Sequence, residues 1–185
     1  MECTEILMHF MANRTYSQKE LDDLVLCPKD IKSSIRKKLK DRRADISFSL
    51  RSQDGEHSFR VFASRSIEVE RNFSVGLTYL PPEGVDFNVI RCNGDHGSHT
   101  NHVIDARQFE GFHIHRAMAE AFVADEYAEC WATPTTAYSE MAGAIRHPLT
   151  MAHVLDFERL FPAQCTFEQL WGYDDGLYQP ASEAV

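Results

Sequence analysis

Histidines gather in one short part of this chain. Of its nine histidines, five fall within twenty residues: His96, His99, His102, His113 and His115. Imidazole changes its charge near neutral pH and is also the commonest side-chain ligand of transition metals. Solubility is better served by lysine and glutamate, so this density favours a functional role. The segment 96–115 is the strongest candidate for a functional site.

The pattern Phe112-His113-Ile114-His115 is typical of a short strand. Side chains two residues apart on a strand project from the same face, so His113 and His115 are expected to stand side by side if Phe112 and Ile114 face the core. A plainer alternative is that the pair lies on the solvated face of an edge strand and that the preceding loop is merely polar.

One chemistry open to the pair is general acid–base catalysis. Neighbouring imidazoles whose pKa values are pushed apart can take and return a proton, as phosphodiester cleavage of RNA requires. An arginine would then stabilise the phosphoryl oxyanion. The residues that would assist are the loop histidines His99 and His96, with Arg91, Arg107 or Arg116 as the arginine.

The other chemistry is metal binding. His113 and His115 would supply two nitrogen ligands to a divalent ion such as zinc, and a loop histidine a third, which leaves a position for water. The loop offers His96, His99 or His102, and His99 with His113 and His115 is the predicted set. Five cysteines stand singly without a C-x-x-C pair, so a cysteine-based zinc site and a disulfide framework are not expected.

The elements that position these residues follow from periodicity. Alternating apolar residues predict antiparallel strands at 46–50, 59–63, 73–79 and 87–92, with a fifth at 112–115, and Asp54-Gly55 predicts a hairpin. Ser17-x-x-Glu20 predicts a capping box and a first helix. Helical spacing predicts helices at 139–145 and 151–161 and a last turn at 166–171. We therefore expect an α+β fold: a meander of about five strands, N-terminal helices and a helical C-terminal third.

Charge divides the chain unevenly. The formal net charge is −9, yet residues 29–43 hold eight basic and two acidic side chains, a local charge of +6 that leaves −15 elsewhere. Isoleucines at i and i+4 predict that this segment is a basic helix, either a solvated face or a docking surface for nucleic acid or an acidic protein partner. Its candidate binding residues are Lys32, Arg36, Lys37, Lys38, Lys40 and Arg43.

Length and composition predict one domain over 1–185, with a helical appendage at 1–43, a sheet and histidine-loop core at 44–145, and C-terminal helices and tail at 146–185. The chain shows neither a signal peptide nor an apolar run that would span a bilayer, so a cytoplasmic protein without membrane contact is expected. P-loop, Rossmann, G-x-S-x-G and H-E-x-x-H motifs are absent, so no nucleotide cofactor is indicated.

Two segments in order carry a resemblance to a known family. The first is N-G-x-H-G-x-H-x-N, after Arg91 and Cys92, and the second is F-H-I-H; they are followed by Tyr127-Ala128-Glu129, Tyr138 and Ala144. Residues 73–144 thereby resemble a family of uncharacterised prokaryotic proteins. That family has a Thr-Glu-Arg-Tyr-like run where this chain has Met118-Ala119-Glu120-Ala121. The resemblance supports the choice of site and implies no particular activity.

Three functional hypotheses follow. The first is a histidine-centred hydrolase or nuclease-like domain that acts on a phosphodiester, RNA above all, in a toxin or phage-defence setting. The second makes the same histidines ligands of a divalent metal. The third is a non-catalytic interaction subunit of a toxin–antitoxin or defence pair, in which the histidines form a structural hydrogen-bond network.

Overall fold

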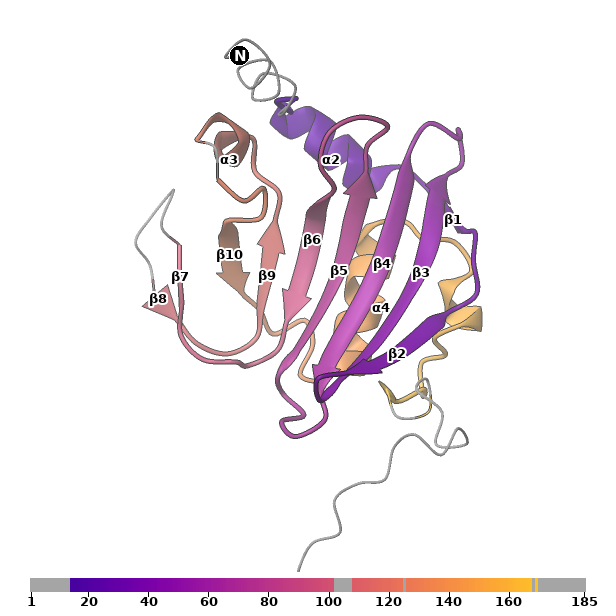
Figure 1. Ribbon diagram of the computed structural model, residues 1–185, viewed down its shortest axis with the longest axis vertical. Coiled ribbons are helices and arrows are strands. Elements are labelled where there is room, and N and C mark those ends of the chain that lie inside the picture. The colour runs from indigo at the N-terminus through magenta and orange to yellow at the C-terminus, as the bar shows by residue number, and fades with distance from the viewer. Residues whose placement is uncertain (1–13, 102–107, 125, 168, 170–185) are drawn as a thin grey trace, which may run out of the picture.

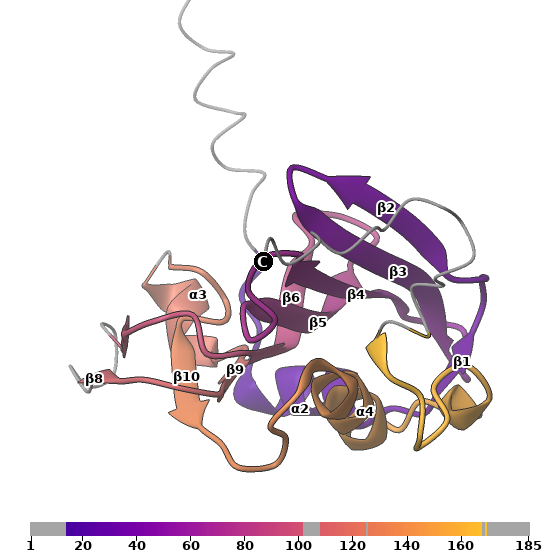
Figure 2. The ribbon, with the colours of Figure 1, turned by 90° about the horizontal axis from the view of Figure 1, so that it is seen from below.

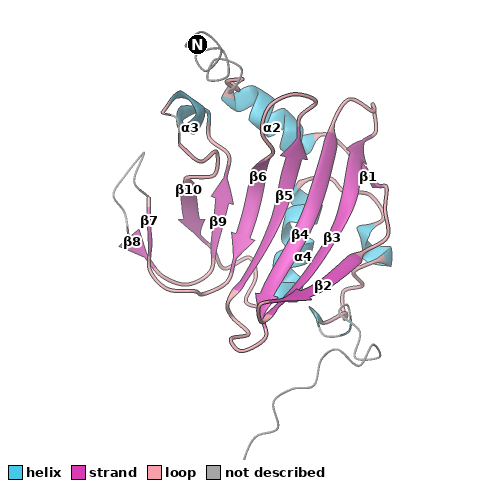
Figure 3. Cartoon of the chain, viewed as in Figure 1, coloured by secondary structure: helices cyan, strands magenta, loops and turns pink. Residues whose placement is uncertain are grey.

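One antiparallel sheet of eight strands forms the body of the described chain, which comprises residues 14–101, 108–124, 126–167 and 169 of a computed structural model (Figures 1 and 3). Its order is β1-β3-β4-β5-β6-β9-β10, and β2 pairs with β3 beside β1. The strands are β1 (Lys29–Ile31), β2 (Arg36–Lys40), β3 (Arg43–Ser52), β4 (Ser58–Ser66), β5 (Phe73–Leu80), β6 (Phe87–Asn93), β9 (His113–Arg116) and β10 (Trp131–Pro134). A separate small hairpin joins β7 (His99–Thr100) to β8 (Gln108–Phe109).

Two helices cover one face of the sheet. Figure 2 shows α2 (Gln18–Leu26) and α4 (Met141–Met151) together below the strands. Leu21 of α2 and Ile145 of α4 are each 1% exposed and pack in one cluster with the inward-facing residues of β3 to β6. Burial of this apolar surface is the main source of stability. The short α3 (Ala119–Val123) lies between β9 and β10 in sequence.

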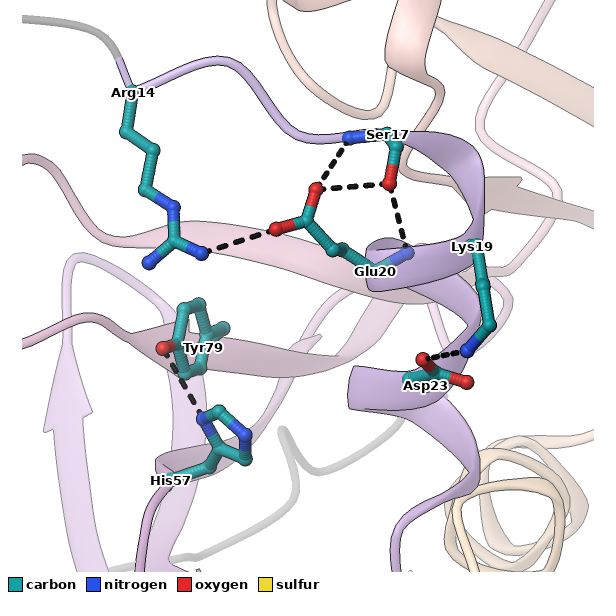
Figure 4. A network of polar contacts seen from close by, with 7 residues as sticks. All are labelled: Arg14, Ser17, Lys19, Glu20, Asp23, His57 and Tyr79. Carbon is teal, nitrogen blue, oxygen red and sulfur yellow. Dashed lines mark hydrogen bonds and ion pairs between the residues drawn. The ribbon is translucent and has the colours of Figure 1, made fainter.

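The predicted start of the first helix is confirmed. Ser17 is the N-cap of α2: its hydroxyl accepts a hydrogen bond from Glu20 N at 3.3 Å, and its own N–H donates to Glu20 Oε2 at 2.8 Å (Figure 4). This reciprocal capping box satisfies two backbone donors that the helix leaves unpaired. The helix ends at Leu26, just before Cys27 and Pro28.

The expected architecture is wrong in its strand count and in its C-terminal third. The five predicted strands form as β3, β4, β5, β6 and β9, but β1, β2 and β10 extend the sheet to eight. The predicted helix at 151–161 is replaced by turns and a short 3-10 helix (Phe157–Arg159), because the backbone there pairs with β1: Leu155 N donates to Lys29 O at 2.8 Å. Residues 170–185 lie outside the described part.

The predicted basic helix is also wrong. Its residues form β1 and β2, and β2 pairs with β3 through a two-residue turn at Asp41 and Arg42, whose φ angles are 48° and 62°. Two left-handed central residues are the mark of a type I′ hairpin turn, which usually carries glycine or asparagine. Pairing with β3 outweighed the helical spacing of the isoleucines, since tertiary contacts override weak local preference. Within the predicted N-terminal appendage, β1 and β2 therefore belong to the sheet.

One cation of this segment is buried. Lys29 has no exposed surface, and its ammonium donates to the carbonyls of Val25 (2.7 Å), Cys27 (2.7 Å) and Ala152 (3.1 Å). These carbonyls end α2 and α4, where the helix dipoles are negative. Lys29 thus joins two helix ends to β1 and is unavailable to any partner. No helix within the described residues is both long and apolar enough to cross a membrane.

Candidate metal centre

His113 and His115 share one face of β9 and are buried. His113 is 0% exposed and His115 is 3% exposed, whereas Ile114 and Arg116 point to the helix-covered face, where Arg116 contacts Met151. The prediction that both imidazoles project together is confirmed. The alternative of a solvated edge strand is wrong, because β6 and β10 flank β9 on both sides.

The loop after β6 brings His99 onto this pair. The His99 ring centroid lies 5.1 Å from that of His113 and 4.7 Å from that of His115. The candidate ligand atoms of the three side chains all lie within 4.8 Å of one another. Phe109, across the β7–β8 hairpin, packs 5.1 Å from the His99 ring. The metal set predicted from sequence is the set that the fold assembles.

Asn101 holds the loop in this position. Its side-chain amide donates to Ala132 O at 2.8 Å and accepts from Ala132 N at 2.9 Å. Ala132 lies on β10, the last strand in the order of the sheet, so the amide binds where a further strand would pair. Asn101 is 1% exposed. Because His99 is two residues away, this double hydrogen bond fixes the approach of the third imidazole.

Backbone carbonyls set the tautomers of the two strand histidines. His113 Nδ1 lies 2.8 Å from Gly111 O, and His115 Nδ1 lies 2.8 Å from Glu129 O. A carbonyl only accepts, so each Nδ1 carries the proton and each Nε2 carries a lone pair. This arrangement, with Nδ1–H on a carbonyl and Nε2 free to bind, is the usual support of metal-ligating histidines.

The surroundings of each Nε2 test the fit of a metal. His115 Nε2 is buried and has no hydrogen-bond partner among the described residues, which is costly unless something binds there. His113 Nε2 faces Asn93 Nδ2 at 3.2 Å, a contact that an ion would replace. Two nitrogens on a tetrahedral zinc at about 2.0 Å lie roughly 3.3 Å apart, so small side-chain rotations suffice to bring the three together. The residues fit a divalent ion.

Electrostatics keep both strand histidines neutral. Burial lowers the pKa of His113 to about 4, and burial together with the Arg91 guanidinium lowers the pKa of His115 to about 3. Arg91 pairs with His115 across β6 and β9 and projects from the same face. Neutral imidazole is the form that binds metals.

A carboxylate and a guanidinium stand beside the centre. Arg91 Nε lies 3.0 Å from Glu129 Oε1, and the pair is mostly buried. No hydrogen bond to the buried Glu129 Oε2 is found among the described residues, and burial raises the pKa of this carboxyl against the opposing effects of Arg91 and of a side-chain hydrogen bond from Asn88. A carboxylate with an unsatisfied oxygen is poised to accept a proton.

These groups line a cavity of about 510 Å³, hereafter the metal pocket. This size is within the range usual for small-molecule sites. Its lining comprises Arg91, His99, Thr100, His115, Glu126, Tyr127, Glu129 and Cys130. An ion at the three histidines would thus face a space that also holds a base and a cation.

The remaining predicted residues lie elsewhere. The His96 ring packs 5.0 Å from that of His113, but its ring nitrogens are not part of the three-histidine cluster. Arg116 points to the opposite face, and His102 and Arg107 lie outside the described residues. On the basic segment, Arg36, Lys37, Lys38 and Lys40 are exposed on β2, Lys32 is exposed and pairs with Asp30, and Arg43 is partly buried against Ser64.

The basic strand is far from the histidines. Five strand steps separate β2 from β9, and at about 4.8 Å each they place the two strands roughly 24 Å apart along the sheet. Figure 1 shows β2 at one edge and β9 with β10 near the other. The histidines and the basic segment therefore form separate surfaces.

Sequence reasoning missed three supporting residues: Glu129, Asn101 and Tyr138. The Tyr138 hydroxyl lies 2.7 Å from His113 O and 3.1 Å from Asn93 O, which fixes the end of the β6–β9 ladder. Glu129 and Tyr138 belong to the segments that carry the family resemblance, and Asn101 ends the first of them. That co-occurrence with the histidines was the available signal.

Comparison of this chain with family models, curated proteins and solved structures found no match.

Proposed function

We propose that this protein is a metal-dependent hydrolase that cleaves a phosphodiester at the three-histidine centre. The observation that carries the proposal is the convergence of His99, His113 and His115, two of them with Nε2 presented by an Nδ1–H bond to a carbonyl. A zinc-class ion bound there would supply an activated water or hydroxide at neutral pH.

The chain's own residues divide the remaining work. Glu129 accepts a proton through Oε2, which has no hydrogen-bond partner among the described residues, and burial raises the pKa of this carboxyl above its usual range. Arg91 stands beside His115 in the same cavity and offsets negative charge on a phosphoryl oxygen. We infer that the substrate is anionic from the position of this arginine.

The geometry favours the metal over an acid–base pair of histidines. Acid–base cleavage of RNA needs one imidazole protonated at working pH, whereas burial lowers the pKa values of His113 and His115 to about 4 and 3. The toxin or phage-defence setting stays a prediction.

Elemental analysis of protein purified without a metal-affinity tag tests the proposal. We expect about one equivalent of zinc or a similar ion, lost in His115→Ala, together with hydrolysis of 4-nitrophenyl methyl phosphate that falls at least 100-fold in Glu129→Gln. Glu70→Gln, an exposed site on the β4–β5 turn, is the control. Metal-free protein after reconstitution with zinc, cobalt or manganese would overturn the metal centre; metal binding without hydrolysis would favour a structural or interaction role.

A second function is polyanion binding by the cationic strand β2 and its turn into β3, residues 36–43, hereafter the basic hairpin, and a specific observation favours it. All five residues of β2 are exposed, and four of them are cationic: Arg36, Lys37, Lys38 and Lys40. We propose that this surface docks nucleic acid or an acidic protein, independently of the metal pocket. Lysines on an edge strand also prevent strand-to-strand aggregation, and a purely protective role predicts no binding.

A further inference from the structure

A second cavity adjoins the metal pocket. It measures about 190 Å³ and lies between the β5–β6 connection and the segment that follows α3. Glu126 and Tyr127 line both cavities, so they form a shared wall. The space is smaller than a usual small-molecule site, which suits one substituent of a larger molecule.

Aromatic rings form much of this cavity. Tyr16, Phe87 and Phe122 pack with one another, with ring centroids 5.0 Å to 5.1 Å apart. Tyr127 and Val85 stand at the rim and are 85% and 70% exposed. Large apolar side chains so exposed around a cavity mark a place where another molecule binds.

Carboxylates surround the aromatic rings. Glu83, Asp86 and Glu126 line the cavity, and within the described part of the chain Asp86 has a single, distant ion pair, at 3.8 Å, with Arg60. The one basic side chain among the described lining residues is Arg14, whose charge is drawn to Glu20 at 3.1 Å. The net charge at the cavity is therefore negative.

The cavity already holds a cation–π contact. The Arg14 guanidinium lies 4.9 Å from the centre of the Tyr16 ring, and Figure 4 shows Arg14 reaching toward Glu20 at the start of α2. Aromatic faces attract cations, and carboxylates at the rim add to this attraction. A neutral apolar group would gain from the rings but not from the carboxylates.

We infer that this cavity binds a substituted ammonium group. A further step rests on the proposed function. The ammonium group is a substituent of the phosphodiester and lies in this cavity, on one side of Tyr127, while the phosphate lies in the metal pocket on the other side. The substrate class is thus an amino-alcohol phosphodiester. A long polyanion is disfavoured in this second cavity, because the carboxylates at its rim would repel the neighbouring phosphates.

Binding of choline and of its neutral isostere 3,3-dimethylbutan-1-ol, followed by NMR at low salt, tests the ammonium site without any hydrolysis. Choline should bind at least tenfold more tightly than the alcohol. Tyr127→Ala and Glu126→Gln should each weaken choline binding about threefold to tenfold. Glu70→Gln, at the opposite end of the strands, should leave it unchanged. Equal affinity for both probes, or no binding of either, overturns the inference.

Turnover by the zinc-loaded protein tests the link to the substrate. 4-Nitrophenylphosphorylcholine should show a KM at least tenfold below that of 4-nitrophenyl methyl phosphate, and Tyr127→Ala should narrow this difference between the two KM values. Equal KM values overturn the link. Choline binding without hydrolysis of either ester would instead overturn the proposed function and leave the ammonium site standing.

Discussion

The histidine centre and the basic hairpin both stand out in the sequence by composition, yet the fold treats them in opposite ways. His113 and His115 are buried between β6 and β10, and each is oriented by a backbone carbonyl. Lys37 and Lys38, near the other edge of the sheet, are exposed, and no ion pair of either is found within the described residues. Burial fixes the two histidines in a single geometry, whereas exposure to solvent leaves the lysine side chains without such a constraint.

The difference teaches where specific chemistry can reside. Fixed, desolvated side chains hold an ion or a reacting group at one position, because folding has already ordered their rotamers and hydrogen bonds before the ligand binds. Exposed lysines supply a screened and diffuse positive potential, which attracts polyanions without selecting among them. The two regions should therefore respond differently to acid, mutation and salt.

Acid should have the largest effect, and it should act on the histidine centre rather than on the basic hairpin. Unfolded histidine titrates near pH 6.5, whereas burial lowers the folded pKa values of His113 and His115 to about 4 and 3. Between pH 6.5 and 4 the unfolded state binds protons that the folded state refuses, so the free energy of unfolding is fully retained above pH 6.5 and falls below it. The loss is on the order of 3 kcal/mol per histidine.

Denaturant unfolding of metal-free protein at pH 7.5 and 4.5, with NMR titration of the two rings, measures this effect. Ring titration near pH 6.5 would contradict the expected coupling to folding and would place the imidazoles in water.

The choice of third ligand gives the next largest effect. His99→Ala should weaken zinc binding at least 100-fold, about 2.7 kcal/mol, because it removes one of the three converging imidazoles. His96→Ala is the matched control, since its ring contacts His113 without joining the cluster, and it should change the affinity less than threefold. Competition with a chromophoric chelator measures both. A larger loss of zinc affinity in His96→Ala than in His99→Ala would show that His96, and not His99, is the third ligand.

Asn101 should affect zinc binding indirectly, by positioning His99. Asn101→Ala removes both hydrogen bonds to Ala132, which should cost about 2 kcal/mol of stability and weaken zinc binding about tenfold. Val61→Ala, a buried change on β4 with a comparable stability cost, should leave the affinity intact. The visible spectrum of the cobalt-substituted protein separates the two variants, because only a displaced His99 alters the coordination. An unchanged spectrum in Asn101→Ala would show that the hydrogen bonds to Ala132 do not position His99.

The basic hairpin should show the smallest effect on the fold. Replacing Lys37, Lys38 and Lys40 together with glutamine should change the free energy of unfolding by less than about 0.5 kcal/mol, since all three are exposed. The same change should weaken binding to a duplex DNA probe and lower its salt slope by about 3. Binding that is absent in the parent protein, or indifferent to these changes, would leave β2 with a protective role at the sheet edge.

Part of the fold was predictable because its signals are local. The Ser17–Glu20 capping box and the Asp54-Gly55 turn depend on residues close in sequence, and both form. The type I′ turn at Asp41 and Arg42 lacks the usual glycine, so the β2–β3 hairpin went unpredicted. The helix expected at 151–161 failed because its backbone bonds to β1, more than a hundred residues away.

The sequence by itself determined that His113 and His115 project together, because the two-residue period of a strand requires it. It also determined that a histidine-rich loop precedes them. Only the tertiary structure decided that His99 completes the set, that carbonyls fix the tautomers, and that Glu129 and Arg91 share the metal pocket. The physical reason is that these contacts join segments brought together by the β6–β9–β10 pairing and by Asn101, which no local pattern encodes.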